Sequence, residues 1–135
     1  MSAAAARRIA LAVALTVTAL ASAPTAVFAQ QYYGAISLSP SSGALGWGFD
    51  YPTPQGAEEA AIRNCRKFAR EFGRDCRIAE VFQNGCGAIA MGDRGYGSAS
   101  SSSRTKAEQD SLEICRSESR NCTIMRWICT SGSSF

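Results

Sequence analysis

The sequence predicts a small α+β domain made of two pseudo-symmetric strand-strand-helix-strand repeats, with a mainly antiparallel sheet, two helices and three disulfide bonds. Three observations support this prediction. Similar segments recur in the same order about 50 residues apart. Segments that alternate bulky and small side chains lie beside segments with helical spacing. Six cysteines all follow an N-terminal export signal, which is typical of a disulfide framework.

Residues 1–29 have the composition of a cleaved secretory signal peptide. Two arginines precede an apolar run over residues 9–20, and a small-residue region ends at Ala29, which suits cleavage there. A cut after Ala23 satisfies the same rule. Because the apolar run is shorter than the ~20 residues of a membrane span, we expect export to the periplasm or the medium without a membrane anchor. Loss of the two arginines lowers the formal net charge from +3 to +1, which gives no overall attraction to nucleic acid.

The duplication places both copies in a single domain of residues 30–135. Repeat one spans about 33–85 and repeat two about 86–130. Because two copies are fewer than an open solenoid needs, we expect a closed, pseudo-symmetric domain. The aligned segments, copy one first, are 33–38 with 86–91, 55–66 with 105–116, and 76–82 with 122–128.

Repeat one shows each element of the unit in turn. A short strand at 34–38 is followed by a strand at 45–51, in which large and small residues alternate. Thr53 followed by a proline is a helix start, and Gly73 is placed to end the helix. The segment from Cys76 then forms the third strand.

Asn84-Gly85 ends repeat one, and its position between apolar runs predicts a two-residue β-hairpin to the strand at 86–91, which opens repeat two. The triplet around Tyr96 resembles the one around Trp47, but the serine-rich run 98–103 follows it, as an edge strand or a mobile loop. A capping box at 105–108 opens the second helix, and the last strand covers 122–129. The order of strands in the sheet stays open.

The duplication also predicts the disulfide pairs, since six cysteines allow 15 pairings. In each copy one cysteine lies in the helix and one at the start of the next strand, so these two are expected to bond. The third bond then joins the two remaining cysteines. The predicted pairs are Cys65 with Cys76, Cys115 with Cys122, and Cys86 with Cys129. With no histidine and no Cys-x-x-Cys pair, we expect neither a metal site nor a cofactor.

Several phrases of the sequence resemble the exported bacterial proteins grouped as domain of unknown function 4189. They are the segment from Tyr33 to Gly43, the Gly-Trp-Gly triplet, the helix ending Asn-Cys, the Asn-Gly-Cys-Gly-Ala-Ile-Ala stretch and the closing Arg-Trp-Ile-Cys-Thr. The resemblance covers roughly residues 33–130. It implies an exported protein with this disulfide-bearing unit, and it implies no catalytic residues.

Aromatic side chains are the first candidate binding group. Trp47, Phe49 and Tyr51 lie on the bulky face of a strand and would suit sugar rings or a protein partner. The alternative, which we favour, is that this face packs under the helix as core. Tyr33 and Tyr96 are then better candidates for exposed contacts, together with Tyr32.

A row of cations is the second candidate. Arg63, Lys67 and Arg70 lie at helical spacing, and Arg74 continues the row if the helix extends that far. An anionic partner could use them. The favoured alternative is a solvated helix face with a local pair from Glu59 to Arg63.

Catalysis has little support in the sequence. The absence of histidine excludes a Ser-His-Asp or Cys-His site, and no two acids are placed for glycoside chemistry. Glu80 and Arg126 occupy equivalent positions in the two third strands and would pair only if both lie at the symmetry axis. We therefore expect a non-enzymatic binding or protein-interaction module, with a protein or cell-envelope partner. The alternatives are a glycan-binding module that uses the aromatic strand and, least favoured, a small hydrolase.

Overall fold

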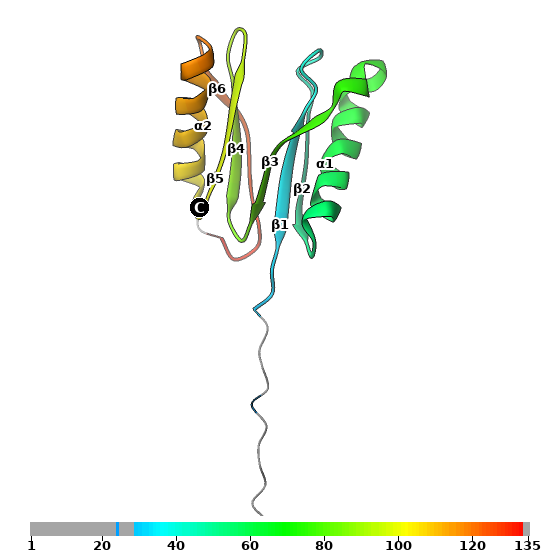
Figure 1. Cartoon of the computed structure of the whole chain (residues 1–135), viewed down its shortest axis with the longest axis vertical. Coiled ribbons are helices and arrows are strands. Elements are labelled where there is room, and N and C mark those ends of the chain that lie inside the picture. Colours follow the sequence, from blue (N-terminus) through cyan, green and yellow to red (C-terminus); the bar gives the residue numbers. More distant parts are fainter. Residues whose placement is uncertain (1–23, 25–28, 134–135) are drawn as a thin grey trace, which may run out of the picture.

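A computed structural model of the chain describes residue 24 and residues 29–133 (Figure 1). Apart from positions 24 and 29, the predicted signal peptide lies outside the described residues. Six strands and two long helices follow the predicted order. Figure 1 shows the two helices on the outside and the strands between them.

Each repeat forms its own antiparallel sheet of three strands, so two sheets replace the single sheet expected. Sheet A has the order β2-β1-β3 and sheet B the order β5-β4-β6, with the first strand of each repeat in the centre. Repeat one contains β1 (Tyr33–Leu38), β2 (Leu45–Tyr51), α1 (Pro54–Ala69), the 3-10 turn η1 (Arg70–Asp75) and β3 (Arg77–Gln83). Repeat two contains β4 (Cys86–Met91), β5 (Tyr96–Ser101), α2 (Arg104–Glu118) and β6 (Thr123–Cys129).

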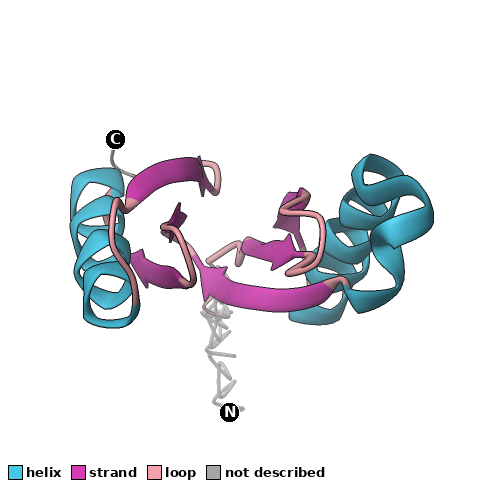
Figure 2. Ribbon diagram, turned by 90° about the horizontal axis from the view of Figure 1, so that it is seen from above, coloured by secondary structure: helices cyan, strands magenta, loops and turns pink. Residues whose placement is uncertain are grey.

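The elements stack in four layers, in the order α1, sheet A, sheet B and α2 (Figure 2). The main core lies between the sheets, where buried side chains from both meet: Ile36, Leu38, Phe82, Ile89 and Ile128. Two smaller clusters join α1 to sheet A and α2 to sheet B, and both are rich in alanine. The pairing of the two repeats therefore creates the largest apolar interior of the domain.

The helix starts follow from capping side chains. Thr53 Oγ1 accepts a hydrogen bond from Gly56 N at 3.1 Å, which confirms the predicted start of α1. In repeat two the N-cap is Ser103, whose Oγ accepts from Lys106 N, so α2 begins before the predicted capping box. The prediction that α1 runs to Gly73 is wrong. The helix ends at Ala69 because the next residue adopts a left-handed φ of 53°, and the chain continues as η1.

The segment Asn84-Gly85 connects the two sheets and does not form the predicted hairpin. Asn84 N donates to Tyr32 O at 2.8 Å, which continues the pairing of β3 with β1. Gly85 N instead donates to Thr130 Oγ1 at 2.9 Å, and Thr130 N donates to Gly85 O, which continues β4 with β6. The strands on either side thus pair with different neighbours, although Asn84 has the positive φ of 45° that its residue type favours.

Three disulfide bonds link neighbouring elements within the two repeats, and they are the pairs that the duplication predicts. Two occupy equivalent places at the C-terminal end of each helix, and the third crosses from β4 to β6. The bonds are Cys65–Cys76, Cys115–Cys122 and Cys86–Cys129, and no described cysteine is free.

The structure also corrects the alignment of the second strands. A Cβ atom placed on Gly46 would meet Ala61 O and Cys65 N, and one on Gly97 would meet the corresponding atoms of α2. Gly46 is therefore equivalent to Gly97, so the counterpart of Trp47 is Ser98 and not Tyr96. The serine-rich run forms a regular edge strand over residues 96–101, paired with β4 without a register shift.

Candidate functional site

The aromatic side of β2 faces away from its helix, contrary to the favoured expectation. The opposite side of β2, which carries Gly46 and Gly48, faces α1. A Cβ atom placed on Gly48 would lie 2.8 Å from both Ala57 O and Ala60 Cβ. Small residues at these positions let helix and strand approach closely. Trp47 instead lies on the side of sheet B, where it packs against the main core. Phe49 is 48% exposed.

Trp47 is contacted from two layers of the protein. The ring of Phe68 on α1 stacks on it with 5.8 Å between centroids, and the guanidinium of Arg126 on β6 lies 3.7 Å from its ring centre. The face of an indole attracts a cation, and desolvation strengthens that attraction. Arg126 is thus engaged with Trp47, and no ion pair joins it to Glu80 within the described chain.

Exposed apolar side chains lie on the three elements that meet at this contact, namely α1, β2 and β6. Phe68 is 54% exposed, and Met125, next to Arg126 on β6, is 52% exposed. With Phe49 they form what we call the β2-β6 cluster: Trp47, Phe49, Phe68, Met125 and Arg126. The sequence pattern indicated Trp47 as a candidate binding residue but not Phe68, Met125 or Arg126, because these three lie on other elements, α1 and β6.

A second cation over an indole lies on the other side of β6. The guanidinium of Arg104 is 3.7 Å from the ring centre of Trp127, and its Nε donates to Glu108 Oε1 at 3.2 Å. Together they line a groove of about 500 Å³ between α2 and β6, bordered by Arg104, Glu108, Ile124, Met125, Arg126 and Trp127. Met125 and Arg126 belong to both features, so the β2-β6 cluster continues around the strand into this groove.

Three of the four tyrosines pack against apolar clusters of the interior and are only partly exposed. Tyr33 and Tyr51 are half-buried against the apolar cluster between sheet A and α1, and Tyr96 packs against the main core. Tyr51 reaches the helix side because the pairing of β1 with β2 shifts register between Tyr33 and Ala35, and Asp50 has a φ of 61°.

The predicted cationic row is only partly continuous. Arg63, Lys67 and Arg70 are exposed, and Arg63 lies 3.9 Å from Glu59 as expected for a solvated pair. Arg74 belongs to η1 and not to the helix. The helix ends before Arg70, so the four cations do not lie on one helical stripe.

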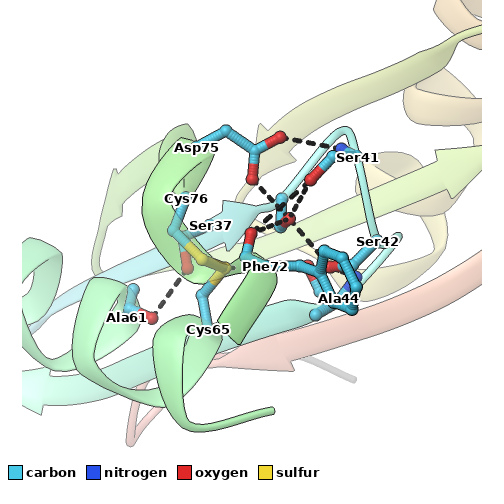
Figure 3. The surroundings of a disulfide bond; sticks show 10 residues. Ser37, Ser41, Ser42, Ala44, Ala61, Cys65, Phe72, Asp75 and Cys76 are labelled. Carbon is cyan, nitrogen blue, oxygen red and sulfur yellow. Dashed lines mark hydrogen bonds between the residues drawn. A yellow bond between two sulfur atoms is a disulfide. The ribbon is translucent and has the colours of Figure 1, made fainter. Parts of the chain in front are cut away.

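A polar network next to the Cys65–Cys76 bond holds η1 against the β1-β2 loop (Figure 3). Ser39 Oγ donates to Asp75 Oδ1 at 2.6 Å, and Ser41 N donates to Asp75 Oδ2 at 2.8 Å. The hydrogen bond from Ser39, followed by that from Ser41, lowers the pKa of the Asp75 carboxyl from its ordinary value. Every polar group here has a partner within the protein, which indicates a structural role.

Two further findings concern residues 29–133. No group of three or more Asp, Glu or Cys side chains there could hold a metal ion, and none of the helices described is long and apolar enough to cross a membrane. The expected lack of a cofactor stays a prediction.

The geometry defines a duplicated, disulfide-bonded α+β domain whose two sheets pack face to face between two helices. The chain belongs to the family described as domain of unknown function (DUF4189), whose model matches residues 33–129, and the suspected family is thereby confirmed.

The chain is similar to proteins of mycobacteria. It is 38% identical over 68 residues to Protein Rv1269c of Mycobacterium tuberculosis and to Protein Mb1300c of Mycobacterium bovis, matching 50% of this chain and 48% of each relative. It therefore spans about half the length of these curated relatives. The NMR structure of Rv1813c from Mycobacterium tuberculosis has the same fold, with a TM-score of 0.52 and 23% identity, over 95% of this chain and 99% of that one.

Proposed function

We propose that the protein is an exported, non-enzymatic module that binds a partner protein through the β2-β6 cluster. The observation that supports this is that α1, β2 and β6, which meet at the contact of Trp47 with Arg126 and Phe68, each carry a large apolar side chain that is about half exposed. Trp, Phe, Met and Arg are the residue types enriched in protein interfaces, whereas Lys and Glu are depleted there. Single exposed apolar residues are ordinary, but a group of them marks an interaction surface.

Rigid support strengthens the proposal. The cluster draws side chains from α1, β2 and β6, and disulfides anchor α1 to β3 and β6 to β4. A surface that is already ordered loses little conformational entropy on binding, which favours affinity. Complete pairing of the described cysteines supports the exported location, because such bonds persist in oxidising compartments.

The glycan-binding alternative is disfavoured by the surroundings of Trp47. A sugar ring binds a tryptophan by stacking on its face. Here Phe68 and Arg126 already contact the ring from α1 and from sheet B. Binding would have to displace one of them. Tryptophan fluorescence that shifts on titration with peptidoglycan fragments would restore this alternative.

The test is affinity capture with the oxidised protein, from periplasmic extract and culture medium, followed by a binding measurement with each captured protein. We expect Phe49→Ser with Met125→Ser to weaken binding at least about tenfold, as for interface residues at a hot spot. Phe72→Ser is the matched control, since Phe72 is 61% exposed but lies in η1, outside the cluster. Equal binding by the double variant and the control would refute the assignment.

A further inference from the structure

The edge strand β5 presents a row of main-chain groups with no neighbouring strand. Gly92 N donates to Gly95 O at 2.9 Å at the turn between β4 and β5, and hydrogen-bonded pairs alternate along an antiparallel ladder. The N–H and C=O groups of Tyr96, Ser98 and Ser100 therefore point away from β4. Because β5 ends the order of sheet B, these groups face outward.

The equivalent edge in repeat one is capped. The outward C=O of Trp47 on β2 accepts a hydrogen bond from Asn64 Nδ2 at 2.7 Å. In repeat two Ser98 takes the place of Trp47, and Ile114 takes the place of Asn64, one residue before the helix cysteine. Within residues 29–133 no side chain hydrogen-bonds the outward main-chain groups of β5. The two repeats have thus diverged in how they protect the same strand edge.

A groove with an acidic border runs beside this uncapped edge. It has a volume of about 480 Å³ and lies between β5 and α2, bordered by Ala99, Asp110, Glu113, Ile114 and Ser117. Ile114 is 45% exposed. Asp110 is bound by a lysine one turn earlier, whereas Glu113 forms no ion pair within the described residues. The groove therefore combines an apolar floor with unneutralised negative charge.

We propose that an extended segment of a partner protein, with basic side chains at alternate positions, adds to β5 as a fourth strand of sheet B. Its main chain pairs with Tyr96, Ser98 and Ser100. Side chains at alternate positions of an added strand point to the same face, so one set lies over Ile114 and Glu113. This binding site is separate from the β2-β6 cluster and goes beyond the function proposed above.

The charge beside β5 favours a basic peptide over a second copy of the chain as the strand that pairs with this edge. Antiparallel pairing of β5 with its own copy would place the two α2 helices side by side on one face of a joined sheet. Glu113 of each copy, which forms no ion pair within the described residues, would then approach the acidic border of the other copy, and like charges in a desolvated contact are unfavourable. A basic peptide meets these acids with the opposite charge.

The test uses two blocked eight-residue peptides, one alternating valine with lysine and one alternating valine with glutamate. Each is titrated into the oxidised protein and followed by amide NMR shifts. We expect the lysine peptide to shift resonances of β5 and the facing side of α2, and the glutamate peptide to bind at least about tenfold more weakly, the loss expected for reversing a favourable charge contact.

Three variants sharpen the test. Ile114→Asn installs the counterpart of Asn64 and should weaken lysine-peptide binding about fivefold, since a cap competes for one main-chain hydrogen bond. Ser100→Pro removes an N–H that sheet B does not use, so the fold survives while a pairing group is lost. Glu113→Lys should reverse the preference between the peptides. Phe49→Ser, which tests the β2-β6 cluster, should leave peptide binding unchanged.

Four results would overturn the proposal. The first is equal binding of both peptides, and the second is a set of shifts outside β5 and α2. The third is concentration-dependent shifts of β5 without peptide, which would assign the edge to a second copy. Binding that survives both Ser100→Pro and Ile114→Asn would likewise exclude pairing along the strand.

Discussion

The close approach of each helix to a glycine in its edge strand gives the sharpest stability prediction. Gly97 is equivalent to Gly46, and a Cβ at either position would lie under 3.0 Å from helix main-chain atoms, against 3.4–4 Å for ordinary contact. Main-chain atoms in the middle of a helix cannot move separately, so Gly97→Ala must push α2 away from β5. Overpacking of this kind costs about 1–3 kcal/mol, and contact with two main-chain atoms places it near the upper value, about 3 kcal/mol.

The assay is thermal unfolding of the oxidised variants. For a domain of this size a loss of 1 kcal/mol lowers Tm by about 4–8 °C, so Gly97→Ala and Gly46→Ala should each lower it by about 12–24 °C. Gly95→Ala is the matched control, because its Cβ would find its nearest neighbour at 3.5 Å. Each glycine-to-alanine change also reduces the conformational entropy of the unfolded chain by a similar amount, so this effect cancels when the variants are compared. The sequence alignment instead equates Gly46 with Gly95. A large loss in Gly95→Ala and none in Gly97→Ala would refute the structural register.

Three other outcomes follow from the described contacts. The hydrogen bonds to Asp75 lower the pKa of its carboxyl, so their contribution to stability is present above the unfolded pKa of about 3.9 and is lost as pH falls through the folded pKa. Ser39→Ala should raise the folded pKa of Asp75 in an NMR titration. Replacing Cys86 and Cys129 by serine should lower the free energy of unfolding by about 4 kcal/mol in denaturant unfolding, against about 2.5–3 kcal/mol for either of the other bonds. The reason is loop length, since the sequence separation is 43 for this bond and 11 and 7 for the others, and equal losses would contradict the loop-entropy account. Asn64→Ala should cost about 1 kcal/mol in the same assay by uncapping β2, and no loss would mean that water replaces the cap.

The duplication made the element order and the cysteine pairs predictable from sequence. Both depend on equivalent positions along the chain, and the same local rules act in both copies. Thr53 before a proline marked a helix start correctly, since capping involves residues three apart. In contrast, the path of the chain through Asn84-Gly85 depends on hydrogen bonds to Tyr32 and Thr130, which are distant in sequence. The local sequence signal for a hairpin was therefore misleading.

The candidate site was less accessible from sequence for a related reason. The alternation in β2 showed that one side was bulky and one bare, but not which side faced the helix. The glycine side packs on α1, because Gly46 and Gly48 let the helix approach so closely that a larger residue would not fit there. Trp47 was singled out, whereas its partners Phe68 and Arg126 come from α1 and β6. The packing of α1 on β2 brings Phe68 to Trp47, and the stacking of the two sheets brings Arg126.

The shared interior of the two sheets makes each repeat depend on the other. Repeat one contributes Ile36, Leu38 and Phe82 to the main core, and repeat two contributes Ile89 and Ile128. Neither repeat alone could shield its half from water. A chain with one repeat could therefore bury these side chains only against a second copy. The connection at Asn84-Gly85 keeps both halves in one polypeptide, so the core forms at any protein concentration.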